Sequence, residues 1–351
     1  MGGKALKEIP KGKETRRYQK DEFRSLSNIL LPKVRDVFKT KAELVESYKN
    51  KESFGDMDIL VLNNGFNIDI PFDSDFATEV KKIIQKEFEP NQIHRTKNSN
   101  VYSFDYNRLQ IDLILTEDKE WESSNIFYMW GDLGNFMGKL FSSYGNLSSH
   151  GYLLKYGYDG IKVNFNSKKN KLFLSRDNKK VFEFLGLDFE KFKEGFESKE
   201  EVFAYIMTSK FYNYNIFQWD NLNHVNKSRN KKRKDYYLFL EYIEENDKST
   251  SIIEYNETKD YYLNELKEFF GVDLKKEHKV IQDRIKLNKK VSSKFNGHHI
   301  LGDFKINPNR IYQLVTTFKK SIESEYESYN DFILSNDLDV ILEKFKQINE
   351  L

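Results

Sequence analysis

An α+β fold is predicted by the order of two kinds of pattern along the chain. Apolar residues at helical spacing predict a helix over residues 21–38, with Pro32 as a candidate break, and a second over residues 76–88. From Gly271 onward the spacing is helical again, so a helical C-terminal region is expected. Short apolar runs predict the strands of a mixed sheet at residues 44–48, 57–62, 101–104 and 109–115.

Changes in these patterns divide the chain into four segments. A length of 351 residues is enough for two or three domains with cores of their own. We expect a helical segment, a mixed-sheet unit, an aromatic-rich segment and a helical domain, over residues 1–40, 41–118, 119–205 and 206–351.

Composition predicts a globular protein of the cytoplasm. The chain is 38% hydrophobic and 32% charged, and it has no apolar run of the roughly 20 residues that span a membrane. The basic N-terminus lacks the apolar stretch of a signal peptide. We therefore expect a cytoplasmic location and no membrane partner.

The absence of cysteine limits the kinds of metal site and nucleophile that the chain can contain. Disulfides, thiolate zinc sites, iron–sulfur clusters and cysteine nucleophiles are excluded, and only six histidines are present. Any bound metal must therefore rely on carboxylates, which favours Mg²⁺ or Mn²⁺.

Positive charge is concentrated although the net charge is only +2. Residues 227–234 carry six positive charges in eight positions, with aromatic residues before and after them. Such a cluster is either a solvated surface or a track for a nucleic-acid backbone. If a nucleic acid is bound, the candidate contacts are Lys231, Lys232 and Arg233.

Two aspartates in one predicted strand form the first part of a candidate metal site. Asp56 and Asp58 share a face, because side chains alternate across a strand. Carboxylates this close repel each other unless a cation lies between them. Gly55 before them would let the backbone turn and a phosphate approach closely.

A third aspartate, Asp112, lies in an otherwise apolar predicted strand. It either pairs with a structural cation such as Arg108, or it joins Asp56 and Asp58 if the two strands are neighbours. In the second case three carboxylates suit two Mg²⁺ ions about 3.5–4 Å apart, one activating a hydroxyl and one holding a triphosphate.

The segment ESYKNKESFGDMDILV, from Glu46 to Val61, resembles the nucleotidyltransferase signature of DNA polymerase beta and the other family X DNA polymerases. Asp112 follows at the sort of distance that separates the third acid in that family. Residues 127–139 resemble its nucleotide-binding segment, and residues 195–205 resemble the helix that closes its thumb. The resemblance implies a nucleotidyltransferase palm at residues 41–118 and a thumb-like nucleotide-binding region at residues 119–205.

Position by position, the resemblance implies roles for ten residues. The metal ligands would be Asp56, Asp58 and Asp112, with Asp112 nearest the 3′ hydroxyl of the primer. The triphosphate would be held by Ser47, Lys49, Ser53 and Gly55. The sugar, the base and the template side would be met by Tyr128, Asn135 and Lys139, respectively. The chain departs from the family at Glu46, Gln110 and Lys139, where glycine, arginine and arginine are usual.

The resemblance implies transfer of a nucleoside monophosphate from a nucleoside triphosphate to the 3′ end of a nucleic acid, with DNA ahead of RNA. One alternative is a template-independent RNA enzyme that adds CCA or tails. A short resemblance of residues 294–301 to the C-terminal helical region of tRNA CCA-adding enzymes points to it. The other alternative is a catalytically idle binding module, against which the intact acid triad argues. Template use, nucleotide preference and oligomeric state are not indicated.

Overall fold

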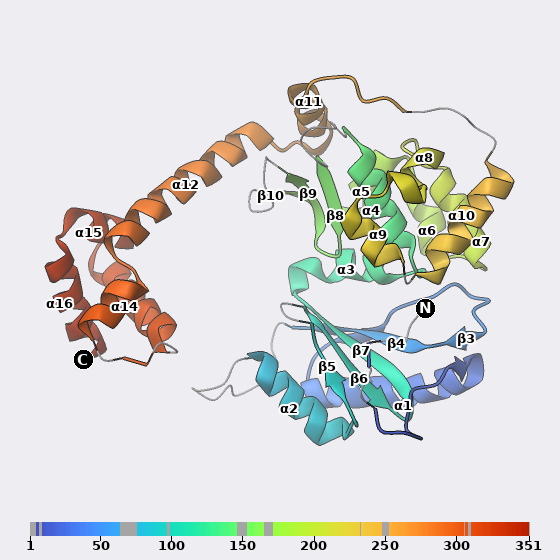
Figure 1. Cartoon of the computed structure of the whole chain (residues 1–351), viewed down its shortest axis with the longest axis horizontal. Coiled ribbons are helices and arrows are strands. Elements are labelled where there is room, and N and C mark those ends of the chain that lie inside the picture. The colour runs from blue at the N-terminus through green and yellow to red at the C-terminus, as the bar shows by residue number, and fades with distance from the viewer. Residues whose placement is uncertain are drawn as a thin grey trace. The chain divides into compact units, whose positions relative to one another are not determined.

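The computed structural model describes residues 5–6, 9–63, 76–96, 99–145, 153–164, 171–231, 233–247, 253–304, 306–307 and 310–350. The chain forms two compact units, Met1–Val272 and Asp273–Leu351 (Figure 1). The predicted α+β class, mixed sheet and helical C-terminal region are confirmed. The finer division at residues 40, 118 and 205 stays a prediction.

A five-stranded mixed sheet is the framework of the first unit, with strand order β2-β4-β7-β6-β5. The central strands β4 and β7 are parallel, and every other neighbouring pair is antiparallel. The strands are β2 (Ala42–Leu44), β4 (Asp56–Leu62), β5 (Ile93–His94), β6 (Val101–Tyr106) and β7 (Leu109–Thr116).

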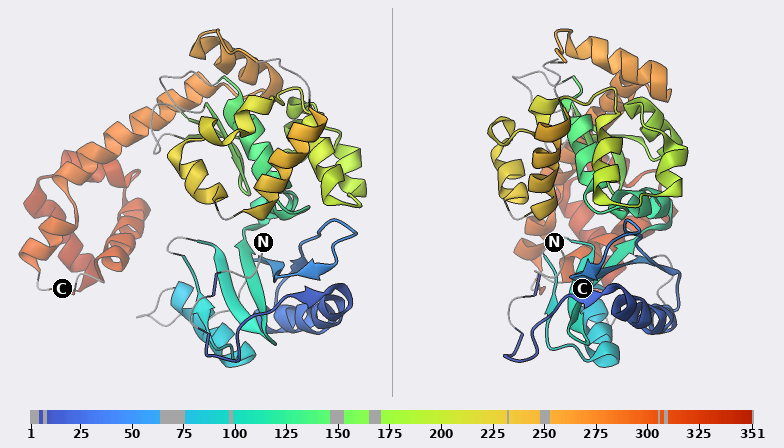
Figure 2. Two further views of the ribbon diagram at one scale, coloured as in Figure 1. Left: turned by 45° about the vertical axis from the view of Figure 1, so that its right-hand side comes forward. Right: turned by 90° about the vertical axis from the view of Figure 1, so that its right-hand side faces the viewer.

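Two helices, α1 (Lys20–Phe38) and α2 (Phe76–Phe88), cover one face of this sheet (Figures 1 and 2). Their apolar side chains pack on alternate residues of the central strands, including Met57 and Ile59, which are fully buried. Because side chains alternate along a strand, Asp56 and Asp58 point to the opposite face. The core under the sheet therefore decides which face carries the charges.

A break or a kink was considered at Pro32, and the structure excludes the break, because α1 continues through this residue. The bounds of one predicted strand were wrong. The strand predicted at residues 44–48 lies earlier, because β2 spans Ala42–Leu44. Val45 N still donates to Asp58 O of β4 at 3.0 Å, and the chain leaves the sheet from Glu46 onward. The backbone carbonyl of Glu46 accepts a hydrogen bond from Trp130 N at 3.1 Å, so this segment is bound to the helical part of the unit instead of to a strand.

The strands predicted at residues 101–104 and 109–115 are connected by a tight turn. β6 and β7 are joined by only Asn107 and Arg108, and both adopt left-handed φ angles of 48° and 64°. Two consecutive left-handed residues match the twist of a two-residue hairpin.

The remainder of the first unit is mainly helical around a small antiparallel sheet of order β10-β9-β8. The elements that matter below are α3 (Trp121–Tyr128), α4 (Leu133–Ser143), β8 (Leu154–Gly157), β9 (Gly160–Asn164), α8 (Tyr214–Phe217), α9 (His224–Asn230) and α10 (Lys234–Asn246). The others are β1 (Tyr18–Gln19), β3 (Ser53–Phe54), β10 (Lys171–Ser175), α5 (Asn178–Leu185), α6 (Phe189–Glu194), α7 (Lys199–Met207) and α11 (Lys259–Phe270), with short 3₁₀ turns at Asp118–Glu120 and Trp219–Asn221.

The second unit is helical and has its own core, in which Phe318, Phe332 and Phe345 pack together. The segment that resembles CCA-adding enzymes forms the start of one of its helices. There the side chain of Asn296 accepts a hydrogen bond from His298 N at 2.8 Å. The helices are α12 (Leu274–Lys294), α13 (Gly297–Asp303), α14 (Ile311–Glu325), α15 (Tyr329–Ser335) and α16 (Leu338–Asn349).

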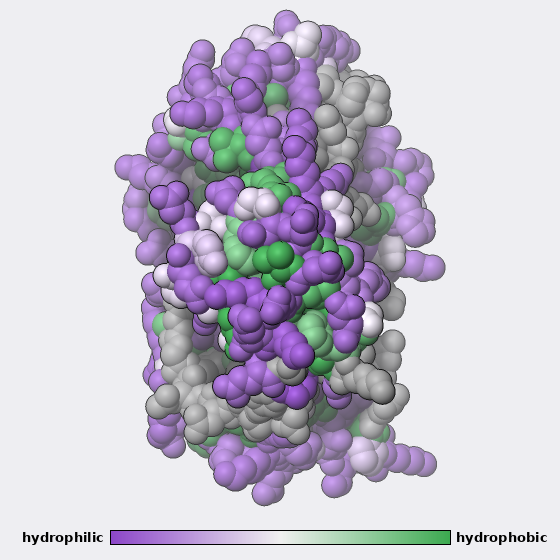
Figure 3. Space-filling model, turned by 90° about the vertical axis from the view of Figure 1, so that its left-hand side faces the viewer, coloured by the Kyte–Doolittle hydropathy of each residue, from purple (hydrophilic) through white to green (hydrophobic). Residues whose placement is uncertain are grey.

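The surface is largely hydrophilic where Figure 3 shows it, in keeping with the charged fraction of 32%. Across the residues that the structure describes, none of the helices has the length and apolar character needed to cross a membrane.

Candidate metal centre

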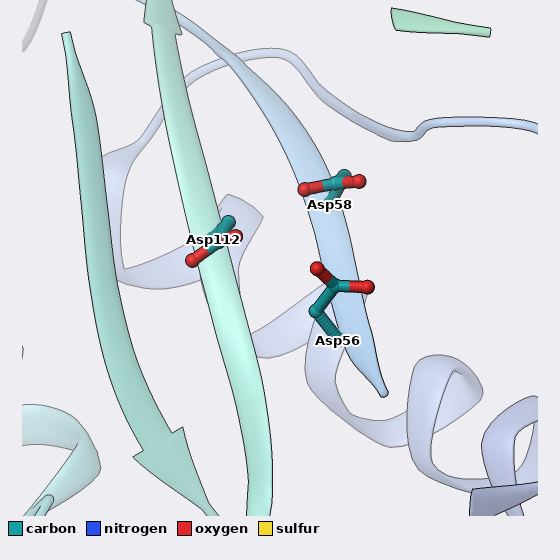
Figure 4. Close-up of side chains that lie close together, drawn as sticks. All are labelled: Asp56, Asp58 and Asp112. Atoms are coloured by element: carbon teal, nitrogen blue, oxygen red, sulfur yellow. The ribbon is translucent and has the colours of Figure 1, made fainter. Parts of the chain in front are cut away.

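Three carboxylates meet on the face of the sheet opposite α1 and α2. Asp58 on β4 and Asp112 on β7 are direct partners in the parallel ladder, and Asp56 lies one pleat earlier on β4. One oxygen from each carboxylate lies within 4.8 Å of the others, and Figure 4 shows the three groups turned toward a common point. The structure therefore brings together the three aspartates that the sequence singled out.

The two strands hold these groups against their mutual repulsion. Burial and the charges of Asp56 and Asp112 hold the pKa of Asp58 well above its usual value. Burial and the charge of Asp56 raise the pKa of Asp112 to about 7, against the hydrogen bonds that it accepts from Ser103 and Gln110. A divalent cation at this point would remove the repulsion.

Asp112 is supported by neutral donors and does not pair with Arg108. The side-chain amide of Gln110 donates to both carboxylate oxygens of Asp112 at 3.0 Å. Arg108 points elsewhere and donates to the backbone carbonyl of Glu14 at 3.1 Å. The alternative in which Asp112 serves a structural ion pair with Arg108 is therefore wrong.

Lys51 is a residue of the site that the sequence analysis missed. It lies close enough for Asp56 and Asp58 to favour its charged form, while burial lowers its pKa. Its position inside the segment from Ser47 to Gly55 could have pointed to it, because a cation beside Asp56 and Asp58 offsets part of their charge.

The predicted triphosphate residues lie along the loop that leads into β4. The hydroxyl of Ser47 is buried and has no hydrogen-bond partner in the described part of the chain. Lys49 instead forms an ion pair with Glu197 at 2.7 Å. Ser53 accepts a hydrogen bond from Arg17 Nε at 3.0 Å, and Gly55 separates it from Asp56. Ser47 is the member of this group that most clearly lacks a partner.

The predicted sugar and base residues lie on the neighbouring helices. Tyr128, at the end of α3, packs with Leu60 and Ile114 on the acid-bearing face of the sheet. Burial and the nearby charges, including that of Asp58, raise the pKa of Tyr128. Asn135 and Lys139, both on α4, line a cavity of the same unit.

The predicted nucleic-acid contacts have different surroundings. Lys231 is exposed, and Lys232 lies outside the described residues. Arg233 forms an ion pair with Asp132, so it is already engaged within the unit. A primer-binding role for these residues stays a prediction.

No protein-family model matches this chain, and no curated protein matches it.

Removing one carboxylate should stabilise the metal-free protein at alkaline pH. Folded Asp112 keeps its proton up to a pKa of about 7, whereas an unfolded aspartate releases it near about 3.9, so this group's contribution to stability falls as pH rises between the two values. Asp58→Asn relieves the repulsion. In EDTA it should raise the melting temperature by about 5 °C at pH 8 and far less at pH 4.

The matched control is Asp105→Asn, in the same sheet but outside the cluster. Asp105 accepts hydrogen bonds from Asn91 and from Gln92 N at 2.6 and 2.8 Å, so its replacement should lower the melting temperature. Adding Mg²⁺ should stabilise the parent and the control, but not Asp58→Asn. A melting-temperature gain for Asp58→Asn that is the same at pH 4 and pH 8 would refute the repulsion argument.

Proposed function

We propose that this protein is a metal-dependent nucleotidyltransferase with a DNA polymerase beta-like palm, and that it adds nucleoside monophosphates to the 3′ end of a nucleic acid. The observation that carries the proposal is the convergence of Asp56, Asp58 and Asp112 from two parallel strands. Three carboxylates at one point suit two hard divalent cations such as Mg²⁺, with Mn²⁺ as a substitute.

The donor set fits this chemistry. All three ligands offer carboxylate oxygens, and no cysteine is present to attract softer metals. When bound, the two ions would activate the attacking hydroxyl and neutralise charge on the triphosphate. The protein's own part is to hold the three oxygens in place, which β4 and β7 do through their shared register.

The loop before β4 supports a triphosphate at the same site. Ser47 presents a buried hydroxyl without a partner among the described residues, which suits a phosphate oxygen. Lys51 adds a partly buried cation whose charged form is favoured by Asp56 and Asp58. A hydroxyl and a cation in this loop suit an anionic substrate.

The proposed acceptor is the 3′ hydroxyl of DNA, in keeping with the resemblance of residues 127–139 to a family X nucleotide segment. A template-independent RNA transferase remains the second candidate. The intact set of three carboxylates at one point argues against a catalytically idle binding module.

Primer extension tests the proposal. Labelled DNA and RNA primers, single-stranded and gapped, are incubated with each nucleoside triphosphate and Mg²⁺. We expect extension by the parent and a loss of at least about a thousandfold for Asp56→Asn, Asp58→Asn or Asp112→Asn, because each removes a metal ligand.

The control for that experiment is Asp36→Asn, which changes an exposed carboxylate that pairs with Lys39 on the surface. It should extend primers like the parent. Extension that survives in all three triad variants, with circular dichroism showing intact folding, would refute the proposed site.

Ser47→Ala should weaken triphosphate use without weakening the fold. Its hydroxyl makes no hydrogen bond within the described residues, so none is lost on substitution. A lost bond to a phosphate oxygen should raise the KM for the triphosphate by about 10- to 100-fold. Ser27→Ala is the control, because that hydroxyl bonds to Arg24 O inside α1. An unchanged KM for Ser47→Ala would remove this residue from the triphosphate site.

A further inference from the structure

Helix α12 (Leu274–Lys294) collects most of the positive charge of the second unit. It has eight lysine and arginine residues against two acids, whereas residues 295–351 have six against nine. Figure 1 shows α12 extending past the bundle that the other helices of its unit form. A single projecting helix therefore carries a charge opposite to that of the rest of its unit.

Six lysines of α12 lie on one face of the helix, which we call the lysine face. At 3.6 residues per turn they fall within about 140° of the helix circumference, and at 1.5 Å per residue they form a row about 22 Å long. Asp283 is the one acid on this face, and Glu277 lies on the opposite side. The lysine face consists of Lys275, Lys276, Lys279, Lys286, Lys289 and Lys290.

The lysine face is open to an incoming ligand. All six lysines are exposed, and between Leu274 and Val291 no residue of α12 is buried. Within the part of the chain that the structure describes, five of the six form no ion pair, the exception being Lys275. The end of the helix is anchored, because Val291 belongs to the core and Lys294 Nζ donates to Leu334 O at 2.8 Å. A folded unit thus presents free charges on a fixed support.

The chemistry of this face favours a nucleic-acid backbone over a protein or a membrane. Lysine is depleted from protein interfaces, where arginine and aromatic residues are enriched. A helix that binds a membrane needs a continuous apolar face, but Glu277, Arg284 and Asn288 interrupt the side of α12 opposite its lysines. A row of point charges instead matches a regular array of phosphates.

The composition of α12 also favours a duplex over a single strand. Proteins hold single strands largely by stacking the bases on aromatic side chains, and α12 has no aromatic residue. A duplex carries one charge per about 1.7 Å of its axis, so a straight row of about 22 Å faces several phosphates at once. Contacts to phosphates alone carry no sequence information.

We propose that the lysine face of α12 binds the phosphate backbone of a nucleic-acid duplex without reading its sequence. In the reaction proposed above it holds the duplex part of the acceptor, and in this respect the inference rests on the proposed function. The binding itself needs neither the metal centre nor a nucleotide, so it can be measured separately.

Binding of a labelled duplex to the full chain tests the proposal. Fluorescence anisotropy is measured in EDTA with DNA and RNA duplexes of about 20 base pairs and with the matching single strands, over a series of KCl concentrations. We expect the parent to bind duplexes more tightly than single strands. A combined variant should weaken duplex binding at least about 30-fold at about 0.1 M KCl and lower the salt slope of the binding constant by about 3. This variant carries Lys276→Gln, Lys279→Gln, Lys286→Gln and Lys290→Gln.

Two controls separate local contacts from net charge. Arginine at the same four positions keeps the charge and should keep both affinity and salt slope. The second control removes four charges from α14 and α16 of the same unit and should change the slope little. All the substituted positions are at least partly exposed, so folding should survive, which circular dichroism checks. The second control carries Lys319→Gln, Lys320→Gln, Lys344→Gln and Lys346→Gln.

Three results would overturn the proposal. They are a glutamine variant of α12 with the salt slope of the parent, a parent that binds single strands as tightly as duplexes, and a parent that binds phosphatidylserine vesicles through α12 but neither duplex. The last result would assign the face to a membrane.

Primer extension distinguishes this inference from the proposed function. The glutamine variant of α12 should raise the KM for a duplex primer and leave kcat and the KM for the triphosphate unchanged. A parent that binds duplexes through α12 but extends no primer would overturn only the proposed function. A parent that extends primers, with an unchanged primer KM in the α12 variant, would overturn only the role of the lysine face.

Discussion

The parallel pairing of β4 with β7 is the constraint on which the rest of the site depends. It makes Asp58 and Asp112 direct neighbours and leaves Asp56 one pleat away. The apolar residues between them are committed to the core under α1 and α2, so a one-residue slip would bury the acids and expose the core. Hydrophobic packing thus enforces an arrangement that electrostatics alone would oppose.

Neighbouring side chains reduce the repulsion among the three carboxylates but do not remove it. Gln110 and Ser103 give hydrogen bonds to Asp112, and neither brings a charge. Lys51 brings one charge, but burial weakens its hold on the proton. Ionising all three acids beside one cation would leave excess negative charge in a half-buried place, and a bound divalent ion would offset it.

The acid cluster could be predicted from the sequence because its periodicity is local. Asp56 and Asp58 alternate with buried aliphatics, and the strand around Asp112 is apolar enough to be central. Which strands are neighbours depends on contacts between residues far apart in the sequence. The sequence could therefore predict that Asp112 joins Asp56 and Asp58 only on the condition that the two strands pair. The strand misplaced at residues 44–48 failed for a related reason. Val45 N still donates to Asp58 O of β4, but from Glu46 the backbone leaves the sheet, and Glu46 O accepts from Trp130 N.

The cavity beside α4 is less visible in the sequence, because its lining comes from seven helices and strands spread over residues 127–236. Asn135 and Lys139 were singled out by resemblance alone, and they do lie in its lining. Arg233 was read as part of a surface charge cluster, yet it pairs with Asp132 at the same cavity.

The backbone of the loop before β4 is held in place by hydrogen bonds to other parts of the unit. Glu46 accepts from Trp130 N, while Lys49 N and Asn50 N donate to the carbonyls of Phe196 and Glu197 at 2.9 and 2.8 Å. The loop is therefore fastened on both sides of Ser47 before any ligand arrives. A loop that is already held in place loses little conformational entropy when a ligand binds. Its contacts with the ligand therefore contribute most of their free energy to affinity. The same bonds also tie the segment that leads into the sheet to the helical part of the unit.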